Sequence, residues 1–272
     1  MKLEIKNLGL KDYNIDMNIY DGEKIGIFAR DNNIVANLLE LIAGINKNNN
    51  SIFLNKVDVF DNEEFFLNRV YFDFKNKYLT TLRVNKIESA LKDYNLEFDK
   101  EKFVQICKEL NIRGETDITY KYEFTNTGNS FVNLALLCSL QKDNIIINNP
   151  LANINLKSDY NYFVNKLASS EFDNVILGID KLLPFKGKLN RILFLSDFNE
   201  SIIMHNNDNF IVFDKDIDKY FLIKDKVYKG NKIIALNNYT KEELKQWQKQ
   251  KVNYEIISIY EIEKYLGEIW KS

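Results

Sequence analysis

The sequence is short of the residues that most often build metal, disulfide and phosphate sites. Its 272 residues include 10 glycines, 2 prolines, 2 cysteines and one histidine, His205. A single histidine excludes a histidine-based metal cluster and weakens every histidine-dependent catalytic scheme. Cys107 and Cys138 lie in apolar, helix-like stretches and cannot form a disulfide framework, which indicates a reducing compartment. The scarcity of glycine bears on function because phosphate-binding loops are built from glycine.

Long hydrophobic runs and an excess of charge of one sign are also missing. The most apolar run, residues 132 to 140, is far too short to cross a bilayer, and the first six residues lack the apolar stretch of a signal peptide. The 37 basic and 39 acidic residues leave a net charge of −2, without the broad positive field of a nucleic-acid-binding protein. We therefore expect no transmembrane segment and no nucleic-acid partner. The 45% hydrophobic content is typical of a globular protein with a sizeable core.

The hydrophobic pattern of the first three quarters of the chain predicts an α/β domain. The run Ile145-Ile-Ile147 is typical of a strand that is buried on both faces. Alternation of such strands with helical segments favours a largely parallel sheet. Strands are predicted at residues 3–8, 15–19, 24–28, 51–54, 69–72, 145–147, 175–177 and 192–195, and helices at 35–43, 82–110, 131–140 and 160–167.

The texture changes after about residue 205, where short strands are joined by charged turns. We predict a small α+β appendage over residues 206–272, after a first domain over 1–205 with a helical subdomain at about 75–140. The appendage is predicted to hold strands at 210–213, 220–223, 233–236 and 254–257, and helices at 241–250 and 258–271.

One segment resembles the phosphate-loop unit of ABC transporter ATPases. From Gly26 to Gly44 the chain has an apolar strand, a nine-residue loop and a helix that ends Leu-Leu-Glu-Leu-Ile-Ala-Gly. Three later segments match in order: residues 51–55 resemble the strand after that helix, 143–155 the Walker B strand with its D-loop, and 189–195 the strand after the switch histidine. The resemblance covers about residues 1–205. It implies a P-loop NTPase-like ABC ATPase fold, with a mostly parallel sheet, antiparallel strands and a helical subdomain.

The residues that bind phosphate in that family are replaced here. A phosphate loop uses glycine to aim backbone N–H groups at phosphate, lysine on the β- and γ-phosphates, and a hydroxyl on Mg²⁺. The resemblance places the three glycines on Ala29, Asn32 and Ile34, the lysine on Val35 and the hydroxyl on Ala36. Because Asp31, Asn32 and Asn33 are good N-cap residues, we expect this helix to be capped by its own chain, with Asp31 repelling a triphosphate.

The other motif positions also lack the residues that the family uses there. The resemblance places the Walker B acids on Asn148 and Asn149, the D-loop aspartate on Asn155, the Q-loop glutamine on Lys75 and the switch histidine on Asp180. An amide keeps roughly the shape of a carboxylate but loses its charge, so we expect weak Mg²⁺ support and no general base.

The signature segment of the family falls on residues 124–128. Thr125 keeps a hydroxyl, Asn126 and Thr127 replace two glycines, and Gly128 closes the segment. In an ABC dimer this segment belongs to the partner's nucleotide site, so the resemblance leaves contact with a partner's ATP open.

These replacements together predict an ABC-type subunit that is not an enzyme and has no catalytic residue, metal or cofactor of its own. We expect it to pair with an active ATPase, a membrane permease or both, at the cytoplasmic face of a membrane. A non-transport adaptor or regulator that works through the appendage is an alternative. A divergent active ATPase, with a lysine from elsewhere such as Lys75, is another.

Overall fold

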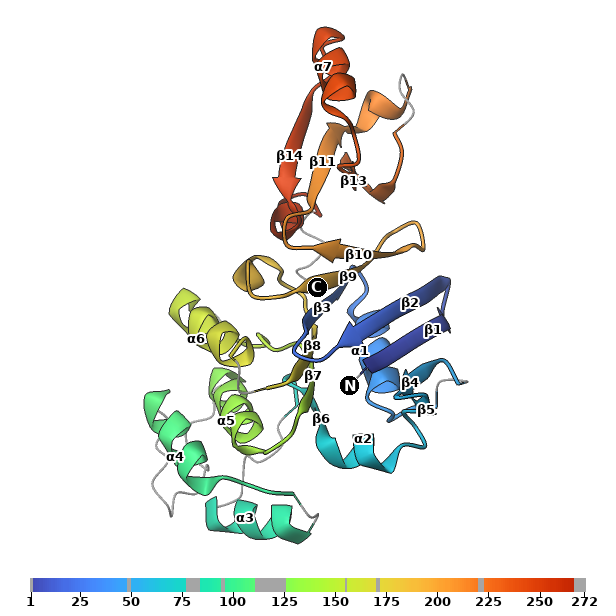
Figure 1. The fold of residues 1–272 in the computed structure, drawn as a ribbon. Coiled ribbons are helices and arrows are strands. Elements are labelled where there is room, and N and C mark those ends of the chain that lie inside the picture. Colours follow the sequence, from blue (N-terminus) through green and yellow to red (C-terminus); the bar gives the residue numbers. More distant parts are fainter. Residues whose placement is uncertain are drawn as a thin grey trace.

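A computed structural model describes residues 2–47, 50–76, 84–93, 96–110, 126–154, 156–169, 172–219 and 223–266. In these ranges the chain forms three sheets, in the strand orders β10-β9-β3-β8-β7-β6, β2-β1-β4-β5 and β12-β13-β11-β14. We call them the central, N-terminal and C-terminal sheets (Figure 1).

The central sheet is parallel except for its edge strand β10, which pairs antiparallel to β9. Every residue of β7 and β8 is buried, so the prediction of strands covered on both faces is confirmed. The strands are β3 (Lys24–Ala29), β6 (Arg69–Asp73), β7 (Asn144–Asn148), β8 (Asn174–Gly178), β9 (Arg191–Leu195) and β10 (Ser201–His205).

Different elements cover the two faces of this sheet. On one face, alternate strand residues such as Ile27, Ile146 and Ile176 join one hydrophobic cluster with helix α1 (Asn32–Ile42) and the N-terminal sheet. On the other face, Ile145, Ile147 and their neighbours pack with helices α4 (Lys100–Glu109), α5 (Asn126–Ser139) and α6 (Lys157–Leu167). The result is a layered α/β domain (Figure 1).

The N-terminal sheet is antiparallel and comes mostly from the first 60 residues. Its strands are β1 (Lys2–Leu10), β2 (Tyr13–Tyr20), β4 (Ile52–Leu54) and β5 (Val57–Asp58). The short helix α2 (Glu63–Asn68) follows and leads into β6. The predicted strands at 3–8, 15–19 and 51–54 are confirmed, with ends that differ by a few residues.

The single helix predicted over 82–110 is wrong. The chain forms two helices, α3 (Val84–Asp93) and α4, and Asp99 caps the second by accepting a 2.9 Å hydrogen bond from the Lys102 N–H. Phe98 forms a β-bridge with Leu140 just before that cap. Because an N-cap residue has extended rather than helical backbone, the helical pattern is interrupted there.

The C-terminal sheet contains β11 (Asn209–Asp214), β12 (Lys226–Lys229), β13 (Lys232–Leu236) and β14 (Tyr254–Ser258), with helix α7 (Lys241–Lys249) on one face. Strands β10 and β12 were not predicted from the sequence. The strand predicted at 220–223 falls mostly on residues 220–222, outside the described residues, after a 3₁₀ helix η2 (Lys215–Lys219). The helix predicted at 258–271 is a 3₁₀ helix, η3 (Ile259–Lys264), and residues 267–272 lie outside the described part.

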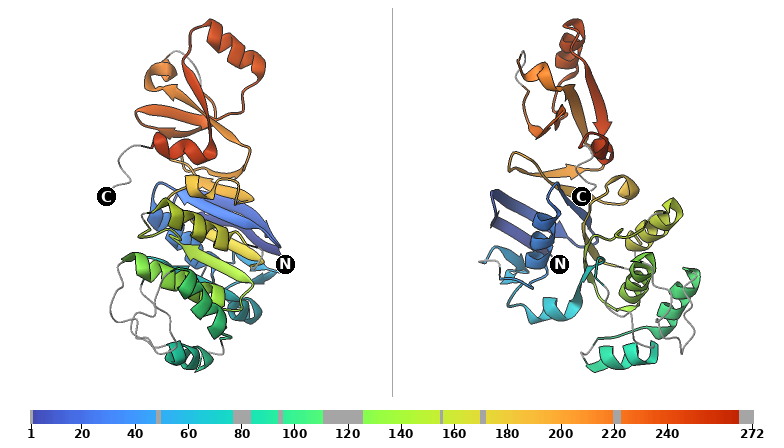
Figure 2. Two further views of the ribbon diagram at one scale, coloured as in Figure 1. Left: turned by 90° about the vertical axis from the view of Figure 1, so that its left-hand side faces the viewer. Right: turned by 180° about the vertical axis from the view of Figure 1, so that it is seen from behind.

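The C-terminal sheet stands at one end of the molecule and α3 and α4 at the other (Figures 1 and 2). One face of this sheet continues the main core, because the Phe210 ring lies 5.5 Å from that of Phe194 in β9. In the described residues, no helix is long and apolar enough to cross a membrane.

Gly44 ends α1 with a backbone φ of +65°, and a Cβ there would lie 2.7 Å from the Val59 carbonyl oxygen. We predict that Gly44→Ala lowers the free energy of unfolding by about 1–3 kcal/mol. The alanine would have to adopt a positive φ, and its methyl group would clash with the Val59 carbonyl oxygen. Urea unfolding measures this. Gly9→Ala is the matched control, since nothing lies within 4 Å of a Cβ at Gly9, and it should stay within about 0.5 kcal/mol of the parent. Equal stability of the two variants would contradict the prediction.

Candidate functional site

The residues singled out from the sequence meet at the carboxyl ends of β3, β8 and β7, which are neighbours in the central sheet. Gly178 ends β8 at the centre of this edge. A Cβ at Gly178 would lie 2.7 Å from Val35 Cγ1 in α1 and 2.9 Å from Asn148 Oδ1 at the end of β7. The position of the family's loop lysine and that of its Walker B aspartate are therefore brought together around this glycine. In open α/β sheets, this edge is where ligands bind.

The loop between β3 and α1 is capped by its own side chain. Asp31 is the N-cap of α1, and its Oδ1 accepts a 2.9 Å hydrogen bond from the Asn33 N–H. The helix starts at Asn32, three residues earlier than predicted, because Asp31 satisfies an amide that would otherwise lack a partner. In its first turn, Asn32 is half-buried, Asn33 is exposed and Ile34 and Val35 are buried. Ala29 ends β3 and is buried, and Ala36 is half-buried.

A lysine from the turn between β1 and β2 reaches this cap. Lys11 Nζ lies 2.8 Å from Asp31 Oδ2, and this hydrogen bond is the main reason that the pKa of Asp31 is lowered. The sequence analysis did not connect this lysine with the loop. Lys11 comes from 20 positions earlier, and no motif spacing connects it with α1.

The two asparagines after β7 hold the strand ends together. Asn148 is buried, and its Nδ2 donates a 3.0 Å hydrogen bond to Asp73 Oδ2 at the end of β6. The Asn149 N–H donates to the Gly178 carbonyl oxygen at 3.0 Å, with a φ of +50° that asparagine tolerates better than most residues. The Lys75 N–H donates to Asp73 Oδ1 at 2.9 Å, and Lys75 is exposed. Sequence reasoning missed Asp73, although it directly follows an apolar strand.

The remaining motif positions are less fully described. Asp180 follows β8, and its Oδ1 is buried without a hydrogen-bond partner. Asn126, Thr127 and Gly128 form the first turn of α5. Thr125 and Asn155 lie outside the described residues.

The turn after β9 is hydrogen-bonded both to the loop between β3 and α1 and to strand β12. Asp197 Oδ2 accepts a 3.1 Å hydrogen bond from Arg30 Nη1, and the Asp197 N–H donates to the Val227 carbonyl oxygen of β12 at 3.0 Å. The hydroxyl of Tyr13 donates to the Ser196 carbonyl oxygen at 2.8 Å. Burial, and then the charge of Asp197, raise the pKa of Tyr13.

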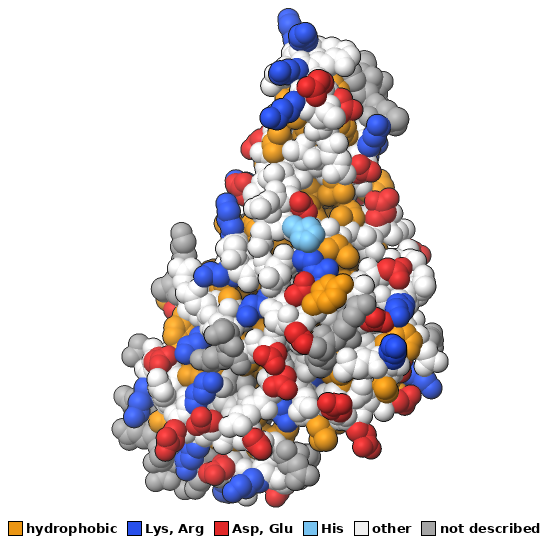
Figure 3. Space-filling view, in the orientation of Figure 1, with side chains coloured by type: hydrophobic (Ala, Val, Ile, Leu, Met, Phe, Trp, Pro, Cys, Tyr) orange, Lys and Arg blue, Asp and Glu red, His pale blue; other side chains and the backbone are white. Residues whose placement is uncertain are grey.

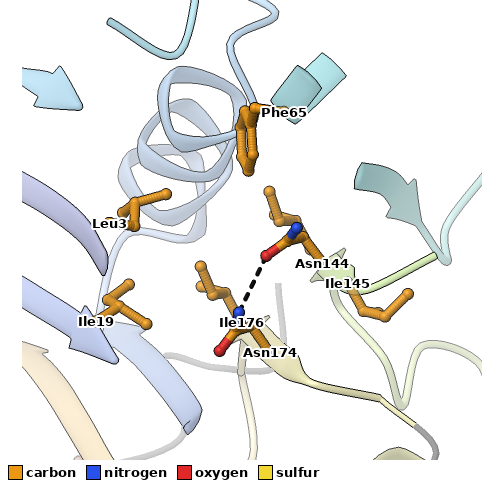
Figure 4. A pocket seen from close by; sticks show the side chains of 8 residues that line it. Leu3, Ile19, Phe65, Asn144, Ile145, Asn174 and Ile176 are labelled. Atoms are coloured by element: carbon orange, nitrogen blue, oxygen red, sulfur yellow. Dashed lines mark hydrogen bonds between the residues drawn. The ribbon is translucent and has the colours of Figure 1, made fainter. Parts of the chain in front are cut away.

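A small hollow elsewhere in the molecule does not belong to this site. Its volume is about 10 Å³, room for at most one water molecule, and it lies at the opposite, amino ends of β7 and β8. There Asn174 Nδ2 donates to Asn144 Oδ1 at 3.1 Å among apolar side chains such as Leu3 and Phe65 (Figure 4). The described residues contain no group of three or more histidine, cysteine or acidic side chains that could hold a metal ion. On the face drawn in Figure 3, acidic and basic side chains are interspersed.

Comparison with known proteins gives a likeness in structure alone. No family model matches the sequence, and no curated protein matches it. Among solved structures, a protein assigned as the cobalt transport ATP-binding protein cbiO-2 superposes with a TM-score of 0.61 at 17% identity, over 88% of this chain and 93% of that one. The fold is that of an ABC transporter ATP-binding domain.

Two further solved structures support the same fold. The cbiO1 protein from Clostridium perfringens, part of the transporter complex cbiONQ, has a TM-score of 0.59 at 14% identity, over 75% of this chain and 88% of that one. The ATP-binding cassette MJ0796, a dimer in a post-hydrolysis state with ADP and Pi, has a TM-score of 0.60 at 14% identity, over 75% of this chain and 99% of that one. The predicted fold class is therefore confirmed.

The expectation that the chain is not an enzyme is contradicted by these comparisons. The solved structures that it resembles are ATP-binding proteins of ABC transporters, and one holds the products of hydrolysis. The expectation rested on side chains alone. Helix α1 still presents the backbone amides of its N-terminus at this edge of the sheet, and the Asp31 side chain accepts from one of them, the Asn33 N–H.

The cap on α1 makes a prediction about stability. We expect Asp31→Ala to lower the free energy of unfolding by about 1 kcal/mol at pH 7, because the Asn33 amide loses its acceptor. The folded protein lowers the pKa of Asp31, so this stabilisation is present above the pKa of an unfolded aspartate, about 3.9, and is lost as the pH falls through the lower folded value. Denaturant unfolding at several pH values measures the difference. Asp31→Asn is the matched control, since asparagine is also a good N-cap, and a loss as large as that of Asp31→Ala would argue against capping.

Proposed function

We propose that this chain is an ATP-binding-cassette subunit of a transport complex, which works with a second cassette and a membrane permease at the cytoplasmic face of a membrane. The observation that supports this most is the loop and helix β3–α1 set beside the ends of β8 and β7 in one parallel sheet. The likeness to ABC ATP-binding proteins over most of both chains supports it further.

The assemblies of the structural neighbours suggest the partners. MJ0796 is dimeric in its post-hydrolysis state, and cbiO1 is part of a multi-subunit transporter. By analogy, the edge of the sheet that carries Asn33 and Gly178 faces a second cassette. The exposed side chain of Asn33 lies at the N-terminus of α1, where it is accessible to such a partner.

We also propose that the loop over residues 29–36 binds a nucleotide phosphate more weakly than a complete phosphate loop. Val35, at the lysine position, is buried and turns its Cγ1 toward Gly178. At the N-terminus of α1, the Asp31 carboxylate already occupies the Asn33 amide and pairs with Lys11. An incoming phosphate has to displace this carboxylate or lie beside it, and both cost free energy.

The test of the nucleotide proposal is a titration of the pure chain with labelled ATP and Mg²⁺. Val35→Lys combined with Ala36→Ser should tighten binding about tenfold or more, because a cation and a hydroxyl return to the phosphates. Val57→Lys is the control, since Val57 is 48% exposed on the edge strand β5, which carries none of the motif positions. A thermal melt shows whether each variant is folded. If the wild type binds ATP as tightly as the double variant does, the proposal that this loop binds phosphate weakly is refuted.

The test of the partner proposal is photo-crosslinking within native membranes. A photoreactive residue in place of Asn33 should crosslink the chain to a second ATP-binding cassette. The same residue in place of Glu242, which is exposed on α7 at the far end of the C-terminal sheet, should not. Crosslinks of equal yield from both positions, or recovery of neither a cassette nor a membrane protein, would count against the proposed assembly.

A further inference from the structure

The last described helical turn of the chain docks beside the candidate site. Helix η3 contacts the 3₁₀ helix η1 (Leu183–Phe185), which follows Asp180 in the loop after β8. Ile262 and Leu266 are buried on one side of this contact, and Leu182 and Phe185 on the other. Helix η3 is thereby packed against the loop that carries the family's switch position.

A half-buried carboxylate lies at this contact. Glu263 accepts hydrogen bonds from the backbone N–H groups of Leu182 and Leu183. Burial, and to a smaller extent the nearby charge of Asp180, raise the pKa of Glu263, while the two backbone bonds and Lys181 act in the opposite direction. Ionisation of Glu263 is therefore less favourable here than it is in water.

The other charged groups around η3 are engaged elsewhere. Lys181 Nζ donates a 2.8 Å hydrogen bond to the hydroxyl of Tyr160 in α6. Glu261 pairs with Lys264 at 2.6 Å, caps η3 through the Ser258 N–H and feels the charge of Lys186. On β14, Glu255 accepts a hydrogen bond from Tyr265. Asp180 and Lys181 are thus the charges that act on Glu263 in the described part of the chain.

We propose that η3 is a proton-sensitive latch on residues 180–183: it docks more tightly when Glu263 is protonated, and in doing so it sets the position of Asp180 at the candidate site. Protonation removes the repulsion between Glu263 and Asp180 and the cost of burying a charge, while the carbonyl oxygen still accepts from the Leu182 amide.

The direction of the pH effect follows from linkage. Docking raises the pKa of Glu263, so the docked state holds the proton more firmly than the released state. Acid therefore favours docking, and alkali favours release. This inference rests on the proposed function only for its consequence at the site, since the contact itself involves no partner and no nucleotide.

Hydrogen exchange of the full-length chain, measured by mass spectrometry from pH 4, below the ordinary pKa of glutamate, to pH 8, tests the latch. The readout is the peptide that contains Leu182 and Leu183, with rates corrected for intrinsic exchange and compared with a peptide from β13. The wild type should lose protection in the Leu182 peptide as the pH rises. Glu263→Gln, which keeps the acceptor without the charge, should stay protected at every pH. Glu263→Ala should exchange about tenfold faster throughout, because the acceptor is gone.

Glu242→Gln, on the exposed surface of α7, is the control and should behave as wild type. A wild-type rate that does not change with pH after correction, or a Glu263→Gln variant that is as pH-dependent as wild type, overturns the proposal. If Glu263→Ala does not fold, these two comparisons still decide the question. If hydrogen exchange shows the pH effect but Asn33 does not crosslink to a second cassette, only the proposed assembly is refuted. If the crosslinks form but the pH effect is absent, only the latch is refuted.

Discussion

The structure depends on burying β3, β7 and β8 from both sides. Because these strands are apolar on both sides, neither face of the central sheet can be exposed to solvent. Each face must therefore be covered by a separate layer of helices or strands. One face receives α1 with the N-terminal sheet, and the other receives α5 and α6. Because the strands run parallel, their carboxyl ends meet at one edge, and the loops that follow them come together there. The site is a consequence of how the core is covered.

Glycine marks where the backbone geometry of that core has been kept. Gly44 supplies the positive φ at the end of α1, and Gly178 allows Val35 and Asn148 to approach the end of β8. At the positions where the family's glycines aim amides at phosphate, the chain has Ala29, Asn32 and Ile34 instead. Under the assignment that the resemblance makes, the glycines that packing needs remain and those of the loop do not.

The C-terminal sheet extends the main core and also touches the site at two points. Through Asp197, β12 is connected with Arg30 in the loop after β3, and through Glu263, η3 is connected with the loop after β8. Both connections use charged side chains, whereas the packing beneath them is apolar. Apolar packing joins the C-terminal part to the main core, and the charged side chains connect it with the two loops.

The sequence by itself determined most of the order of strands and helices in the first 205 residues, because hydrophobic periodicity is a local property of the chain. It missed α2 and β10. It also carried a resemblance that assigns a residue to each motif position, from Ala29 to Asp180, and that assignment stays a prediction. It did not reveal the break at Asp99, because one capping side chain outweighs a helical pattern. Only the tertiary structure brought Lys11 to Asp31, Asp73 to Asn148 and Glu263 to Leu182, since these contacts join segments 20, 75 and 81 positions apart. The packing of the layers determines which of these residues meet, and no local sequence pattern predicts it.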